Sequence, residues 1–123
     1  MTHQIVALDH VQLAMPEGGE DAARRFYAGV LGFGEIPKPA SLASRGGVWF
    51  QSGIVQVHLG VEADFRPARK AHPAIAVRGL AELITLCATK GFEVAPDVEF
   101  DGRERAHVTD PFGNRIEVIE ARA

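Results

Sequence analysis

Cysteine is almost absent from this 123-residue sequence, and its scarcity excludes two kinds of structure. With Cys87 as the single cysteine, the chain can form neither an internal disulfide nor a zinc cluster built from several thiolates. Cys87 lies in "LITLCATKG", on the apolar stripe of an expected helix. We therefore interpret it as a small buried hydrophobe rather than a nucleophile.

Excess positive charge and long apolar runs are lacking as well. The 16 acidic residues outnumber the 13 basic ones, and a net charge of −3 argues against a nucleic-acid-binding surface. No apolar run approaches the roughly 20 residues needed to cross a bilayer. The opening "MTHQIVALDH" has no basic segment followed by an apolar core. We therefore expect no signal peptide, no membrane association and a cytoplasmic location.

What the sequence does contain is the same pattern twice. Each half begins with an apolar strand-like segment, continues with a helical pattern and finishes with three short strand candidates. The two helices are predicted to end at Gly32 and Gly91, each followed by phenylalanine, because glycine readily adopts the left-handed conformation that ends a helix. The repeat predicts an α+β fold in a single domain, residues 1–123, with βαβββ units at about 5–61 and 72–120 joined by a loop at 62–71.

The helix of each unit is predicted from apolar residues at helical spacing. The first helix falls in "EDAARRFYAGVLGF" and the second in "GLAELITLCATKG". One helix covers only one face of a four-stranded sheet, so the opposite face of each sheet stays open. The two open faces must therefore enclose a ligand together or pack against another chain.

Strand alternation indicates which side chains lie on these open faces. Residues i and i+2 of a strand share a face, so the apolar residues of each strand locate the polar ones on the other side. Val11, Leu13 and Met15 are expected to face the helix, which leaves His10 and Gln12 on the open face. The same argument places these further side chains on the open faces: Gln56, His58, His72, Arg105, His107, Arg115 and Glu117.

Four of these residues hold equivalent positions in the repeat. His10 and His72 open equivalent first strands, whereas His58 and Glu117 lie late in equivalent last strands. A pseudo-twofold axis between the halves would bring these side chains to one point. Three neutral imidazoles and one carboxylate suit a divalent transition metal, and the pattern does not select among zinc, nickel, iron, manganese and cobalt.

Charged and aromatic residues near these positions are candidates for substrate binding. The cluster Arg66, Arg69 and Lys70 is either a solvated loop or a clamp for the carboxylate or phosphonate of an anionic substrate. Trp49 and Phe50 lie on opposite faces of one strand, so one of them must line the open face. Three further residues of the open faces complete the candidate set: Gln12, Gln56 and Arg105.

The segment "DPFGN" has a structural explanation. Asp110 and Pro111 are typical of the start of a turn, and Gly113 or Asn114 can adopt a positive φ. We predict a hairpin turn between the last two strands, which helps to aim Glu117.

Four segments in order resemble the vicinal oxygen chelate superfamily, which includes glyoxalase I, fosfomycin-resistance transferases, extradiol dioxygenases and bleomycin-resistance proteins. The segments are "LDHVQLAM", "ARRFYAGVLGF", "HPAIAV" and "DPFGNRIEVIE", and the resemblance runs from about residue 5 to residue 120. It implies a glyoxalase-like cup with metal ligands at His10, His72 and Glu117. Bacterial glyoxalase I carries a glutamate at the position of His58, so His58 is expected either as a ligand or as a nearby base.

The resemblance implies two classes of function. The first is a metal-dependent, glyoxalase-like isomerase or lyase that moves a proton on a small oxygenated anion, with His58 or His107 as catalytic base. A thiol transferase and an extradiol dioxygenase are alternatives within the superfamily. The second class is a metal-free protein that sequesters a ligand, like the bleomycin-resistance members. We also expect a homodimer, because half-covered sheets leave edges and apolar rims that a small monomer protects poorly.

Overall fold

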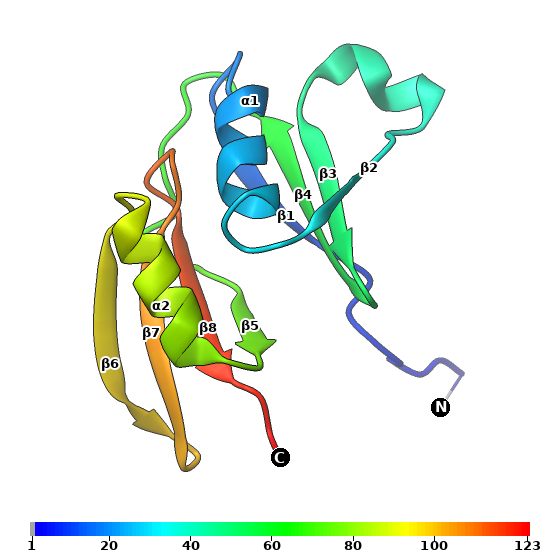
Figure 1. Ribbon diagram of the computed structural model, residues 1–123. Coiled ribbons are helices and arrows are strands. Elements are labelled where there is room, and N and C mark those ends of the chain that lie inside the picture. Colours follow the sequence, from blue (N-terminus) through cyan, green and yellow to red (C-terminus); the bar gives the residue numbers. More distant parts are fainter. Residues whose placement is uncertain (1) are drawn as a thin grey trace.

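The computed structural model describes residues 2–123 and contains two βαβββ units (Figure 1). The first unit consists of β1 Val11–Met15, α1 Glu20–Ala23, β2 Gly34–Ile36, β3 Val48–Ser52 and β4 Val55–Val61. The second consists of β5 Ala74–Val77, α2 Leu80–Thr89, β6 Val94–Phe100, β7 Arg103–Thr109 and β8 Arg115–Glu120. The α+β class predicted from the repeat is confirmed.

Each unit forms its own four-stranded mixed sheet. The strand orders are β1-β4-β3-β2 and β5-β8-β7-β6, so the two sheets have the same topology. In each sheet the first strand runs parallel to the last, and the other neighbours are antiparallel. The register places His58 between Gln12 and Trp49, and it places Glu117 opposite His107. Each sheet therefore carries an imidazole or a carboxylate at the centre of its open face.

The first helix differs from the regular helix expected from the sequence. Only Glu20–Ala23 is α-helical, and Arg24–Ala28 forms a π-helical turn. The Leu31 amide accordingly donates to the carbonyl of Phe26, five residues earlier, at 2.9 Å. Phe26 and Tyr27, adjacent in sequence, are both fully buried in this turn.

One hydrophobic core extends through both units. Phe26 of the first unit contacts Phe92 of the second, with 4.8 Å between the ring centroids. Leu80 and Cys87 are the buried residues of α2, and burial raises the pKa of the Cys87 thiol. Cys87 is therefore a packed hydrophobe, as predicted. Within residues 2–123, no helix is long and apolar enough to cross a membrane.

The "DPFGN" segment forms the predicted turn and also fastens the two units together. Asp110, 4% exposed, accepts hydrogen bonds from the Tyr27 hydroxyl at 2.7 Å and from the backbone and side-chain amides of Asn114. Asn114 in turn donates to the Ala14 carbonyl on β1 and accepts from the Ala68 amide in the connecting loop. This buried network fixes the start of β8 relative to the first unit.

Tyr27 provides a pH test of this packing, because it is the only tyrosine in the chain. Burial and the nearby Asp110 carboxyl raise the pKa of its phenol well above the usual value of 10.0. Because the pKa of Tyr27 is higher in the folded protein, its neutral phenol contributes fully to stability below the phenol pKa of the unfolded chain. This contribution is lost as the pH rises through the pKa of the folded state. In an alkaline titration, tyrosinate absorbance should appear only together with the loss of circular dichroism. Absorbance that rose while the protein stayed folded would contradict the burial.

Candidate metal centre

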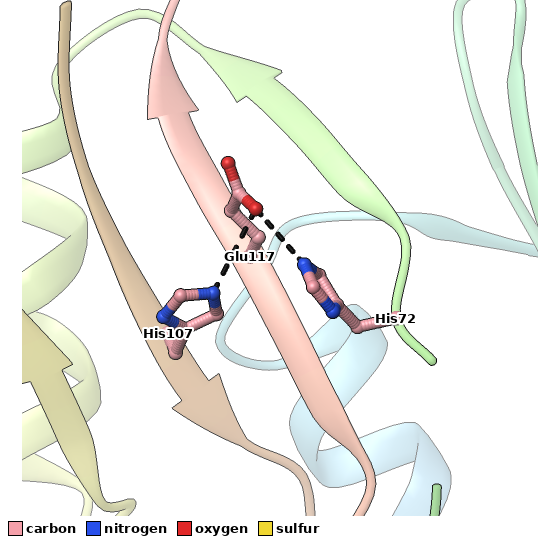
Figure 2. A group of neighbouring side chains, drawn as sticks. All are labelled: His72, His107 and Glu117. Carbon is pink, nitrogen blue, oxygen red and sulfur yellow. Dashed lines mark hydrogen bonds and ion pairs between the residues drawn. The ribbon is translucent and has the colours of Figure 1, made fainter. Parts of the chain in front are cut away.

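Two histidines and a glutamate meet on the open face of the second sheet (Figure 2). One donor atom each of His72, His107 and Glu117 lies within 4.8 Å of the other two. Glu117 comes from β8, His107 from the neighbouring β7, and His72 from the segment just before β5. Glu117 and His107 are each 7% exposed, so two of the three donors are largely withdrawn from bulk water.

Hydrogen bonding determines which nitrogen of His72 faces Glu117. The Nδ1 atom lies 2.8 Å from the Lys70 carbonyl oxygen, which can only accept, so Nδ1 carries a proton. In the neutral ring, Nε2 then has a lone pair, and this atom lies 2.9 Å from Oε1 of Glu117. Two lone pairs at that distance repel each other unless a cation lies between them. A proton or a divalent metal ion fulfils this condition, and a carbonyl that fixes the ligand tautomer is a common feature of metal sites.

Two further side chains, Arg105 and His107, lie close to the carboxylate of Glu117. Arg105 Nη1 lies 3.4 Å from Oε1, and the same arginine pairs with Asp97 at 3.3 Å. His107 Nε2 is buried and, among residues 2–123, has no hydrogen-bond partner. It lies 3.7 Å from Oε1 of Glu117. Because buried polar atoms nearly always have partners, this nitrogen indicates a site that a further group completes.

A second cluster of rings lies on the sheet of the first unit. His58, 4% exposed, stacks on Trp49 and on His10, with ring-centroid distances of 3.8 and 4.2 Å. Its Nε2 lies 3.0 Å from Oε1 of Gln56. The Nδ1 atom of His10 lies 2.9 Å from the Asp9 carboxylate, so Nε2 of His10 is available to bind a metal.

The two buried imidazoles are neutral near pH 7. Burial is the main cause that lowers the pKa of His58 and of His107 from the usual 6.5. The neighbouring His10 lowers the pKa of His58 further, and Arg115 does the same for His107. Each ring therefore keeps one nitrogen with a lone pair at physiological pH.

The predicted ligands thus form two groups in this chain. His72 and Glu117 lie together, whereas His10 lies beside His58. Within residues 2–123, the group that could hold an ion contains His107 and neither His10 nor His58. The convergence of His10 with His72 and Glu117 stays a prediction. His107, expected on this face only as a base, is an additional donor of the group.

Of the two aromatic candidates, only Trp49 lines an open face. Trp49 lines a crevice together with Gln12, Lys38 and Arg45. Phe50 is fully buried and packs on the ring of Tyr27, with 5.6 Å between centroids. The prediction that Phe50 binds substrate is therefore wrong, because the side chain of Phe50 faces the helix side of β3.

The connecting loop positions the site through its backbone. The carbonyl of Lys70 binds His72, and the carbonyl of Arg69 lies 3.4 Å from Nη1 of Arg115. The side chains of Arg66, Arg69 and Lys70 are exposed, and Arg66 lines a crevice that also contains His72. A role for these cationic side chains in binding a substrate stays a prediction.

Two residues near the site were given no role in the sequence analysis. Arg115 shares the face of Glu117, as alternation predicts, and its Nη2 lies 3.3 Å from Nδ1 of His107. Asp97 reaches Arg105 from β6, where the register shifts between Asp97 and Phe100. Alternation placed Arg115 on this face, but it could not predict the orientation of Asp97, which precedes an irregularity in its strand.

Paired βαβββ sheets with histidine and glutamate donors on an open face define a protein of the vicinal oxygen chelate class. A glyoxalase family protein from Bacillus anthracis is 45% identical to this chain, with 99% of this chain and 100% of that chain covered and a TM-score of 0.93. The chain belongs to the glyoxalase family, so the family resemblance of the sequence is confirmed.

More distant structures share the fold. A glyoxalase family protein from Enterococcus faecalis is 19% identical, with 93% and 97% of the two chains covered and a TM-score of 0.69. The fosfomycin resistance protein FosX from Listeria monocytogenes is 14% identical, with 98% and 94% covered and a TM-score of 0.71. No family profile and no curated protein matches the sequence.

Proposed function

We propose that this protein is a metal-dependent enzyme of glyoxalase type, an isomerase or lyase that acts on a small oxygenated anion. The observation that carries the proposal is the 2.9 Å approach of Nε2 of His72 to Oε1 of Glu117, on a ring whose Nδ1 faces the Lys70 carbonyl. Membership of the glyoxalase family supports it. A divalent ion bound there would supply Lewis acidity toward two oxygens of a chelated substrate.

The chain's own residues have distinct roles in this proposal. Glu117 and His72 hold the ion. His58 is the catalytic base: its ring is neutral, and with Nε2 bonded to Gln56 its Nδ1 can accept a proton. The cationic side chains of the connecting loop, Arg66 above all, attract the anionic group of the substrate.

We further propose that His10 reaches the metal ion from a second copy of the chain. In one chain His10 lies outside the donor group of Glu117. The segment before it exposes Ile5 at 89%, Val6 at 84% and Leu8 at 78%, and it extends away from the body of the molecule (Figure 1). Such apolar segments are protected when they pack on another chain. In a twofold dimer, the open face of the first unit of one copy would meet the open face of the second unit of the other.

Charged substitutions in the exposed segment test the dimer. The double variant Ile5→Asp with Leu8→Asp should be monomeric, because two carboxylates cannot be buried in an apolar interface without pairing. Light scattering over a wide dilution range measures the mass. Val98→Asp is the matched control, since Val98 is 73% exposed on β6, in the other unit, and its change should leave a dimer. A wild-type protein that is monomeric at all concentrations would contradict the proposal.

Metal restoration followed by a substrate screen tests the proposed activity. Elemental analysis should find one divalent metal ion per chain. A panel of 2-oxoaldehyde–thiol adducts, an epoxide phosphonate and catechols should then show turnover of an oxoaldehyde adduct. His58→Phe, which keeps a stacking ring beside Trp49, should retain the metal and lose turnover. Ligand binding by a protein that takes up no metal would contradict the proposal and favour the sequestering class.

A further inference from the structure

We infer that His107 donates a hydrogen bond from Nε2 to the bound substrate, and that Arg115 positions it by fixing the tautomer of its ring. The role toward substrate rests on the proposed function. The tautomer is a property of the chain itself and can be measured in the metal-free protein.

Arg115 dictates where the proton of His107 lies. Its Nη2 is 3.3 Å from Nδ1 of His107, and a guanidinium group only donates. Nδ1 must therefore accept with its lone pair, which puts the single proton of the neutral ring on Nε2. Arg115 is itself held in place, because its backbone amide donates to the Ala68 carbonyl at 2.9 Å and its Nη1 approaches the Arg69 carbonyl.

Asp97 would favour the other tautomer of His107, with the proton on Nδ1. Its Oδ2 lies 3.6 Å from Nδ1 of His107 and could accept a proton from that atom if Arg115 were absent. Nε2 would then carry a lone pair directed at Glu117 and could bind a metal. In the structure Asp97 is already paired with Arg105 at 3.3 Å, and it accepts from the Val98 amide. Arg115 thus decides whether His107 is a hydrogen-bond donor or a metal ligand.

The protonated nitrogen lies beside the candidate ligand Glu117. Nε2 of His107 is buried, has no hydrogen-bond partner among residues 2–123, and lies 3.7 Å from Oε1 of Glu117, beyond hydrogen-bond distance. His72 flanks the ring edge-on, with 5.1 Å between centroids, so His107 lies beside both His72 and Glu117 (Figure 2). A small anion with two adjacent oxygens would accept this hydrogen bond, which strengthens as negative charge develops on the oxygen.

Nitrogen-15 NMR of histidine-labelled, metal-free protein tests the positioning role. The His107 signals are assigned by their loss in His107→Phe. Wild type should show the Nε2–H tautomer, and Arg115→Met should convert His107 to the Nδ1–H form through Asp97. Arg78→Met, which removes an exposed arginine elsewhere in the second unit, should leave the tautomer unchanged. An Nδ1–H form in wild type, or an unchanged tautomer in Arg115→Met, would overturn the inference.

Zinc and oxalate titrations test the role toward substrate. His107→Phe should keep the zinc affinity of wild type, because the protonated Nε2 of His107 does not bind the metal ion. Oxalate, a small dianion with adjacent oxygens, should bind the zinc-loaded variant about tenfold or more weakly, as expected for a lost hydrogen bond to a charged group. Loss of zinc from His107→Phe would make His107 a ligand and overturn this inference while leaving the proposed function intact. A wild type that bound no zinc would overturn the proposed function and the substrate role together, whereas the NMR result would still decide the role of Arg115.

Discussion

Replacing His72 by alanine should lower the affinity for zinc by more than about 100-fold. Loss of an outer hydrogen-bond partner of a ligand already costs about 10- to 100-fold, and Nε2 of His72 lies 2.9 Å from Oε1 of Glu117. Competition with a chelating dye measures the affinity. Glu117→Gln should have a similar effect, because it keeps the shape of the side chain and removes the charge that attracts the ion.

The exposed His3 provides the matched control for this series. His3→Ala removes an imidazole at the N-terminus and should leave zinc affinity unchanged. If His72→Ala folded normally and kept full zinc occupancy, His72 would be only a packed ring at the start of β5. The candidate metal centre would then be wrong.

Replacing Asp110 by alanine should lower the free energy of unfolding by about 3 kcal/mol or more. The buried carboxylate accepts from the Tyr27 hydroxyl, from the Phe112 amide and from two nitrogens of Asn114. A single hydrogen bond to a charged group contributes about 1.5–3 kcal/mol, and buried donors left without an acceptor add a desolvation cost. Urea unfolding followed by circular dichroism measures the change.

Glu104→Ala provides the comparison, because Glu104 is an exposed acidic residue of β7. This change should alter stability by less than about 0.5 kcal/mol, as surface substitutions usually do. A loss below about 1 kcal/mol in Asp110→Ala would show that the turn does not fasten the two units.

The faces of the strands could be predicted because side-chain alternation in a strand is strict. Leu13, Met15, Val57 and Leu59 are buried on the helix side, as the apolar pattern requires. His107 follows from the same rule, being flanked by two fully buried residues of β7. The repeat then predicted that His58 and Glu117 hold equivalent positions. The strand register agrees, because His58 pairs with β1 as Glu117 pairs with β5.

The remaining features depend on contacts that alternation does not encode. Alternation assigns a side chain to one face of its sheet, but it does not predict how two open faces are placed relative to each other. It therefore could not predict that His10 lies away from Glu117 within one chain. The π-helical turn at Arg24–Ala28 departs from the regular helical period. The proton positions on His72 and His107 depend on the Lys70 carbonyl and on Arg115, and both contacts arise only after the chain has folded.

Anomalous diffraction from crystals of the zinc-loaded protein tests the central claim most directly. The account predicts a peak about 2.0–2.2 Å from Nε2 of His72 and from a carboxylate oxygen of Glu117, with His10 of the partner subunit as the third protein ligand. A peak bound only by the rings of the first unit, or none between His72 and Glu117 in crystals that contain zinc, would contradict it.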